Sequence, residues 1–168
     1  MANRARFGAE TTTDEVLDGI DLSGRTVIIT GGASGLGQET ARAMAAHGAE
    51  VVIAARDVAK GESAAEAIRQ AVTGASVSVA ELDLGSLASI RRFAEAFTVE
   101  HPSLDLLINN AGVMACPFAT TADGFEMQFG TNHLGHFLLT NLIAPSLIAA
   151  AKDDGDVRVV NLSSRAHH

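Results

Sequence analysis

Short apolar runs rich in Val and Ile alternate along the chain with longer Ala-rich segments whose composition favours helix. This alternation is typical of repeated β-α-β units built around a parallel sheet. The apolar runs predict five strands, over residues 26–30, 51–55, 76–82, 104–109 and 157–162.

Three of the segments between these strands predict helices of ordinary length. The first helix covers residues 35–47. Asp57 is placed to cap the second, which runs to about residue 72. Ser86 begins the third, and the His101-Pro102 pair ends it because proline disfavours helix in the residue before it.

The longest apolar segment predicts a fourth helix, over residues 124–152, with a kink or break at Pro145. Its most apolar part, residues 134–151, is interrupted by His136 and Asn141 among other polar residues. A buried helix explains this pattern better than a membrane span does, because a span needs a longer uninterrupted apolar stretch. We therefore expect no membrane span.

Five parallel strands joined by right-handed crossovers predict a doubly wound, Rossmann-type α/β domain with the strand order 3-2-1-4-5. The domain is expected to cover residues 22–168, after a polar N-terminal extension over residues 1–21. Ligands of such sheets bind beyond the carboxyl ends of the strands, where the winding reverses. Functional residues are therefore expected directly after the strands.

The charge of the chain narrows the class of its partners. Lys and Arg total 12 and Asp and Glu total 20, the formal net charge is −8, and the basic residues form no run. This balance argues against nucleic acid and anionic membrane surfaces. The single cysteine, Cys116, cannot form an intrachain disulfide, and residues 1–21 lack the apolar core of a signal peptide. We expect a cytoplasmic domain that binds a small molecule.

A glycine-rich turn from Thr30 to Gly37 follows the first predicted strand and begins the first helix. Glycine lets the backbone turn tightly and approach a pyrophosphate, and a helix N-terminus offers free N–H groups. The spacing of Gly31, Gly35 and Gly37 differs from the GxGxxG of the general dinucleotide fingerprint. By itself the turn fits a phosphate site and a plain strand-to-helix connection equally well.

Three motifs, in order along the chain, resemble the short-chain dehydrogenase/reductase family. They are Thr30-Gly31-x-x-x-Gly35-x-Gly37, Asn109-Asn110-Ala111-Gly112 and Val159-Val160-Asn161-Leu162-Ser163-Ser164. Residues 56–62, 132–137 and 164–168 further resemble the retinol-dehydrogenase-like branch, and residues 12–17 and 21–24 resemble the related WW-domain-containing oxidoreductase. The resemblance covers nearly the whole chain and implies an NADP-binding Rossmann domain with five of the family's usual seven strands.

The resemblance also implies a dinucleotide site at the ends of the strands. Asp83 would bond the adenine amino group beside the Leu84 backbone, whereas its alternative role is an N-cap for the helix near Ser86. Asn110 to Gly112 would line the ribose edge, and Asn109 would brace the sheet. The cofactor-binding residues implied are Gly31, Ser34, Gly35, Leu36, Gly37, Arg56, Asp83, Leu84, Asn110, Ala111 and Gly112.

The charge that follows the second strand predicts which dinucleotide binds. An NAD enzyme of this fold carries an acid there, about 20 residues beyond the glycine turn, to bind the ribose 2′-OH. This chain has Arg56, whose guanidinium can pair with a 2′-phosphate. NADP(H) is therefore predicted rather than NAD(H). The alternative is a solvated Arg56 at a helix start that Asp57 merely caps.

Two residues match catalytic members of the family that this chain resembles. Asn132 matches the helix asparagine that helps to hold a water in the proton relay, and Ser164 matches the serine that bonds the substrate carbonyl or hydroxyl. The family's Tyr-x-x-x-Lys pair follows on a later helix, and this chain has no tyrosine. His133 and His136 could share a helix face, but no acidic or Cys partner at ligand spacing accompanies them. No metal site is predicted.

The predicted function is hydride transfer between NADP(H) and an alcohol or carbonyl substrate, with this chain as the cofactor-binding front portion of the oxidoreductase. The resemblance implies a homo-oligomer for the full-length enzyme. Two alternatives stay open: an inactive NADP(H)-binding module or sensor, and an incomplete copy of a longer enzyme. Without the partners of its last helix, we expect exposed apolar side chains at Phe137, Leu138, Leu142 and Ile143.

Overall fold

The computed structural model describes residues 7–151 and 156–164, and its strands form one parallel sheet. The order β3-β2-β1-β4-β5 confirms the predicted doubly wound Rossmann topology. The strands are β1 (Thr26–Thr30), β2 (Glu50–Ala55), β3 (Ser76–Glu81), β4 (Leu106–Asn109) and β5 (Arg158–Asn161). Because neighbouring strands pair in parallel, all five carboxyl ends lie at the same edge of the sheet.

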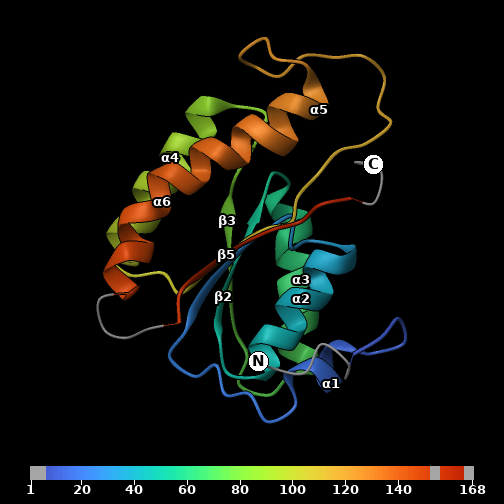
Figure 1. Ribbon diagram of the computed structural model, residues 1–168, viewed down its shortest axis with the longest axis vertical. Coiled ribbons are helices and arrows are strands. Elements are labelled where there is room, and N and C mark those ends of the chain that lie inside the picture. Colours follow the sequence, from blue (N-terminus) through green and yellow to red (C-terminus); the bar gives the residue numbers. More distant parts are fainter. Residues whose placement is uncertain (1–6, 152–155, 165–168) are drawn as a thin grey trace.

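Helices cover both faces of the sheet, with α2 and α3 on one side and α4 and α6 on the other (Figure 1). The helical elements are α1 (Thr13–Leu17), α2 (Gly35–Ala46), α3 (Val58–Ala71), α4 (Leu87–Glu100), α5 (Met127–Phe129), the π-turn η1 (Gly130–Gly135) and α6 (His136–Ala151). Alternate residues of β1 enter the two cores, because successive strand residues point to opposite faces. Val27 and Ile29 pack toward α2 and α3, and Ile28 packs toward α4 and α6.

The fourth strand begins two residues later than the sequence pattern predicts. Residues 104–109 were expected to form the fourth strand, but β4 starts at Leu106. The N–H of Leu104 donates instead to the carbonyl of Ser146 in α6, at 3.1 Å. The carboxylate of Asp105 turns toward β1, where it accepts from Arg25 Nη1 at 2.6 Å and from Thr26 N at 2.9 Å. The first two residues of the predicted strand therefore lie outside β4: Leu104 bonds α6, and Asp105 bonds Arg25 and β1.

The long helix predicted over residues 124–152 is divided differently from the prediction. Gly124 lies in a turn with φ of +84°, and the carboxylate of Glu126 caps α5 by accepting from the N–H groups of Gln128 and Phe129. A π-turn, η1, interrupts the segment before α6, and α6 continues through Pro145 without a break. Lys152 is outside the described residues, as are residues 1–6 and 165–168.

One face of α6 is buried and the opposite face is open. Leu139, Ile143 and Leu147 pack against α4 and the sheet, so the expected exposure of Ile143 is wrong. Phe137 is 63% exposed, as expected, and Leu138 and Leu142 are partly buried. By length and composition alone, Met127–Ala151 also meets the requirement for a membrane-crossing helix. One face of this segment packs against α4 and the sheet, and 33% of its apolar window is buried.

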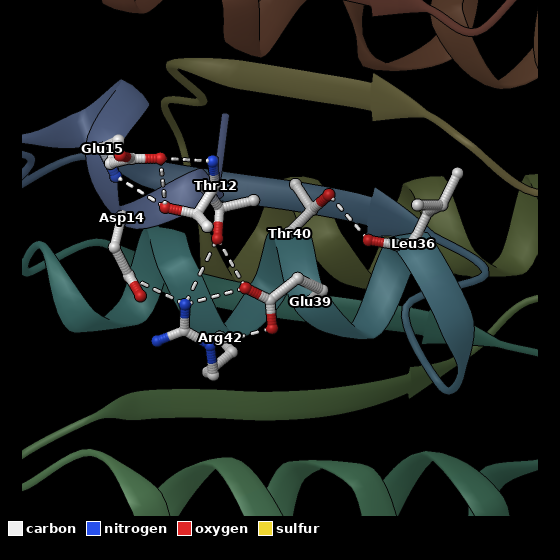
Figure 2. Close-up of polar contacts among 8 residues, drawn as sticks. Thr12, Asp14, Glu15, Leu36, Glu39, Thr40 and Arg42 are labelled. Carbon is white, nitrogen blue, oxygen red and sulfur yellow. Dashed lines mark hydrogen bonds and ion pairs between the residues drawn. The ribbon is translucent and has the colours of Figure 1, made fainter. Parts of the chain in front are cut away.

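Part of the predicted N-terminal extension is a short helix, α1, held against α2 by an ionic cluster (Figure 2). Thr12 and Glu15 cap α1 reciprocally: Thr12 Oγ1 accepts from Glu15 N, and the Glu15 carboxylate accepts from Thr12 N at 2.7 Å. Arg42 of α2 lies 2.8 Å from both Asp14 and Glu39. The hydrogen bond from Arg42 and a second one from Thr13 lower the pKa of Glu39 from 4.5 to about 2.

The docking of α1 on α2 should therefore weaken in acid. Between pH 4.5 and about 2, the folded state holds fewer protons on Glu39 than the unfolded chain does. The stabilisation by Glu39 is thus present above this window and is lost as the pH falls through it. We expect the amide signals of α1 in NMR spectra to shift toward random-coil positions in this window before those of the sheet do.

The variant Glu39→Gln should loosen α1 already at neutral pH, because it removes the carboxylate that accepts hydrogen bonds from Arg42 and Thr13. Glu62→Gln is the matched control, because Glu62 is an exposed partner of Arg69 on α3 and lies outside the ionic cluster of Asp14, Glu39 and Arg42. Unchanged α1 signals in Glu39→Gln would contradict a role for this cluster in docking.

Candidate functional site

A groove of about 330 Å³ lies where the carboxyl ends of β1 to β4 meet. It brings together seven of the residues predicted to bind a cofactor. These are Gly31, Ser34, Arg56, Asp83, Leu84, Ala111 and Gly112. Gly35, Leu36 and Gly37 form the first turn of α2 beside this groove, and Asn110 lies behind it, where its side chain bonds β1.

The backbone of the glycine turn has no room for side chains at two positions. Gly31 has φ of +68°, and a Cβ there would lie 3.0 Å from Ala111. A Cβ on Gly37 would lie 2.5 Å from both the carbonyl oxygen of Gly31 and Nδ2 of Asn110. Real Cβ atoms do not approach so closely, so α2 can begin at this distance from β1 only with glycine. This packing brings the first turn of α2 to the groove.

The first turn of α2 leaves its main-chain N–H groups open to a ligand. Ser34 is the N-cap residue but its side chain makes no capping hydrogen bond, unlike those of Asp57 at α3 and Ser86 at α4. The first N–H groups of a helix have no partner within the helix, and they attract anions. Thr40 stabilises this turn by donating to the carbonyl of Leu36 at 2.8 Å (Figure 2). The arrangement suits a phosphate group.

Two basic side chains line the groove at the end of β2. Arg56 is the predicted one, and Lys60 follows it one helical turn later on α3. Within residues 7–151 and 156–164, neither side chain has an ion pair or a hydrogen bond. Lys60 is not among the residues predicted from the sequence, although its spacing of four residues from Arg56 across a helix start is a readable signal. The two cations can bind one anionic group.

Asp83 lies after β3 and shapes the loop that lines the groove. Its Oδ1 accepts from Gly85 N at 2.8 Å, and its own N–H donates to Ser89 Oγ at 3.0 Å. The alternative role as an N-cap is wrong, because Ser86 caps α4 by accepting from Ser89 N. Asp83 and Leu84 therefore remain at the groove as the resemblance implies.

The hydroxyl of Thr30 links the glycine turn to the segment after β4. It accepts from the N–H groups of Asn110 and Ala111, both at 3.0 Å. The side chain of Asn110 returns to β1 by donating to the carbonyl of Thr30 at 2.9 Å. Asn109 braces the sheet, as predicted, by donating to Asn161 of β5 at 2.8 Å and to Thr140 of α6 at 3.0 Å.

Asn132 and the two histidines lie on or next to η1. The amide of Asn132 bonds both main-chain groups of Val113 at 2.8 Å, so it fixes the loop after Gly112. His133 is exposed and stacks between Phe129 and Phe137. His136 is buried against Thr30, and this burial lowers the pKa of its imidazole while a hydrogen bond to the Asn132 carbonyl opposes the change. The two rings therefore lie in different environments.

Ser164 lies just beyond β5, at the same edge of the sheet as the groove. Neither Ser164 nor Asn132 lines the groove itself. The structure therefore collects the predicted cofactor residues in one place and leaves the two predicted catalytic residues at its margin.

Comparison with known proteins shows which family the chain resembles. The family model described as "short chain dehydrogenase" matches residues 25–168. Human retinol dehydrogenase 12 is 54% identical over 149 residues, which are 89% of this chain and 46% of that protein. The chain thus spans about half the length of the curated relatives it matches.

Solved structures of the same family superpose on the chain. A Pseudomonas aeruginosa RhlG/NADP active-site complex has a TM-score of 0.73 and 30% identity, over 86% of this chain and 54% of that one. A short chain dehydrogenase/reductase from Burkholderia phymatum in complex with NAD has a TM-score of 0.71 and 28% identity, over 87% and 51%. Because the family model, the sequence identity and the fold all match, the chain belongs to the short chain dehydrogenase family, and retinol dehydrogenases are among its relatives.

Proposed function

We propose that this chain binds NADP(H) as part of an oxidoreductase that transfers a hydride between the cofactor and an alcohol or carbonyl substrate. The observation that carries the proposal is the pair of unpaired cations, Arg56 and Lys60, in the groove at the end of β2. An acid at this place would bind a ribose 2′-OH and repel a 2′-phosphate, whereas two cations attract the phosphate.

The residues of the groove have separate tasks in this proposal. The first turn of α2 receives the pyrophosphate, because Gly31 and Gly37 let the backbone approach and Ser34 leaves the N–H groups open. Asp83 and Leu84 border the adenine, and Ala111 and Gly112 border the ribose at the other end. The bound dinucleotide would supply the hydride chemistry, and the protein would supply its orientation and electrostatics.

The names of the relatives support the oxidoreductase class. The preference for NADP(H) over NAD(H) is instead argued from the charges of Arg56 and Lys60. The name of human retinol dehydrogenase 12 supports a dehydrogenase. The RhlG protein was solved with NADP, whereas the Burkholderia phymatum protein was solved with NAD. The second candidate is an inactive NADP(H)-binding module, in which these 168 residues, which contain no tyrosine, would bind the cofactor without turnover. The two candidates share the cofactor site and differ only in turnover.

Removing the two cations should abolish the preference for NADPH. Each charge-assisted bond to phosphate contributes about 1.5–3 kcal/mol, so Arg56→Ala should weaken NADPH binding by about one to two decades and leave NADH binding unchanged. Lys60→Ala should have a smaller effect in the same direction. Fluorescence titration with both cofactors measures this.

Arg69→Ala is the control for a lost charge on α3, because the side chain of Arg69 bonds Glu62, Glu66 and the carbonyl of Val77 away from the groove. It should leave the preference intact. An unchanged NADPH preference in the double variant of Arg56 and Lys60 would refute the assignment of the 2′-phosphate.

Cofactor binding should also depend on the close approach at Gly37. In Gly37→Ala the new Cβ would displace the Gly31 carbonyl or Asn110, so the glycine turn would move and NADPH binding should be lost. Gly74→Ala is the control for backbone destabilisation, since Gly74 has φ of +77° and open space far from the groove. Normal NADPH affinity in a folded Gly37→Ala protein would exclude this pyrophosphate site.

The 168-residue chain alone should oxidise NADPH at no measurable rate with aldehydes or ketones. General acid catalysis contributes about 10²–10⁴-fold, and without tyrosine the hydroxyl of Ser164 would have to supply the proton. NADPH binding, measured on the same sample, separates an inactive protein from an unfolded one. Turnover at ordinary rates, about 1–10³ s⁻¹, would overturn this prediction.

A further inference from the structure

His136 is buried between three segments of the site, with only 7% of its surface exposed. Its Nε2 lies 2.9 Å from the hydroxyl of Thr30, which precedes the glycine turn. Its Nδ1 lies 2.9 Å from the carbonyl oxygen of Asn132. Through Thr30 the ring also connects to the N–H groups of Asn110 and Ala111.

The hydrogen bonds around the ring allow one protonation state. The carbonyl of Asn132 can only accept, so Nδ1 carries a hydrogen. The Thr30 hydroxyl has two acceptor positions, and the N–H groups of Asn110 and Ala111 occupy both, so its own hydrogen is left for Nε2. The competing contact, from Thr30 to the carbonyl of Ile108, is longer at 3.4 Å. His136 is therefore neutral, with its hydrogen on Nδ1.

A second hydrogen on the ring would have no acceptor. A cationic His136 would point an N–H group at a hydroxyl oxygen whose lone pairs are already used, and an unmatched buried donor is costly. In the described part of the chain, the two groups that bond the ring are the Thr30 hydroxyl and the Asn132 carbonyl, and both are uncharged. The N–H groups of Asn110 and Ala111, which bond Thr30, are uncharged as well. Burial lowers the pKa of the imidazole in the same direction.

The ring also replaces a main-chain bond at the π-turn. In an α-helix the N–H of His136 would bond the carbonyl four residues earlier, which is that of Asn132. Here that N–H bonds the carbonyl of His133, and the imidazole Nδ1–H takes the Asn132 carbonyl instead. The geometry of η1 is thus fixed by a side chain that is bonded to β1.

We propose that His136 is a positioning residue of the dinucleotide site: as a neutral Nδ1–H imidazole it ties η1, and with it Asn132 and Val113, to Thr30. Because Asn132 holds the loop after Gly112, His136 sets the end of the groove farthest from Arg56. In the orientation proposed above, the nicotinamide half of the cofactor lies at this end. The inference rests on that proposed function.

Two ligands separate positioning from general stability. Adenosine 2′,5′-bisphosphate reaches only the Arg56 half of the groove, whereas NADPH reaches both halves. In His136→Phe we expect the Kd of NADPH to rise about tenfold, as for a lost hydrogen bond or two. The Kd of the bisphosphate should stay within about twofold of its value in the unsubstituted protein, because distant sites usually couple only weakly. His136→Gln, which restores a polar group toward Thr30, should recover part of the NADPH affinity.

The control is His133→Phe, which removes the exposed histidine of the same segment and should change neither Kd. Equal weakening of both ligands by His136→Phe would overturn the positioning role and leave a structural one. If the unsubstituted protein bound neither ligand, the proposed function would fail and the positioning role with it.

The protonation state can be measured without any ligand or variant. Nitrogen-15 NMR of the unsubstituted chain should show His136 protonated at Nδ1 and unprotonated at Nε2. It should stay so as the pH falls through about 6.5, the usual imidazole pKa. A hydrogen on Nε2, or ordinary titration near that pH, would overturn the assignment even if His136→Phe failed to fold.

Discussion

The alignment of β1 with β4 is fixed by a polar contact at each end of the pair. At the amino end the carboxylate of Asp105 holds Arg25 and the N–H of Thr26. At the carboxyl end the Thr30 hydroxyl holds the two N–H groups that follow β4. A shift of one residue would break both contacts and reverse the faces of the strand. Everything at the groove is placed relative to this pair.

Two unpaired cations line the groove of this acidic chain, beside the carboxylates of Asp57 and Asp83. The chain carries a net charge of −8, yet the unpaired side chains at the end of β2 are Arg56 and Lys60. Elsewhere in the described part of the chain, four arginines pair with carboxylates, as Arg42 does with Asp14 and Glu39, whereas Arg91 and Arg92 on α4 have no ion pair. An anionic ligand is therefore attracted over a short range only, because distant surface charges are screened within about 10 Å. The positions of the unpaired cations therefore indicate where an anionic ligand binds better than the net charge of the chain does.

The repeating β-α-β pattern was sufficient to predict the sheet order, and β1 has the predicted limits because its apolar run is bounded by a turn on each side. Composition could not locate η1, since a π-turn depends on contacts such as the ring of His136 with Asn132. It also could not show that Ile143 faces α4, because a helix apolar all round carries no directional signal. Lys60 was missed although it follows Arg56 by four residues across the start of α3, a spacing that the sequence already shows.

Gly135 ends η1 at a point where main chain meets main chain. A Cβ there would strike the carbonyl of Leu84, in the loop that borders the groove after β3. Neither backbone can yield alone, since η1 is tied to Thr30 and the loop is held by Asp83 and Ser89. Natural variation at position 135 should therefore be accompanied by a compensating change in the loop, and the two segments should diversify together rather than independently.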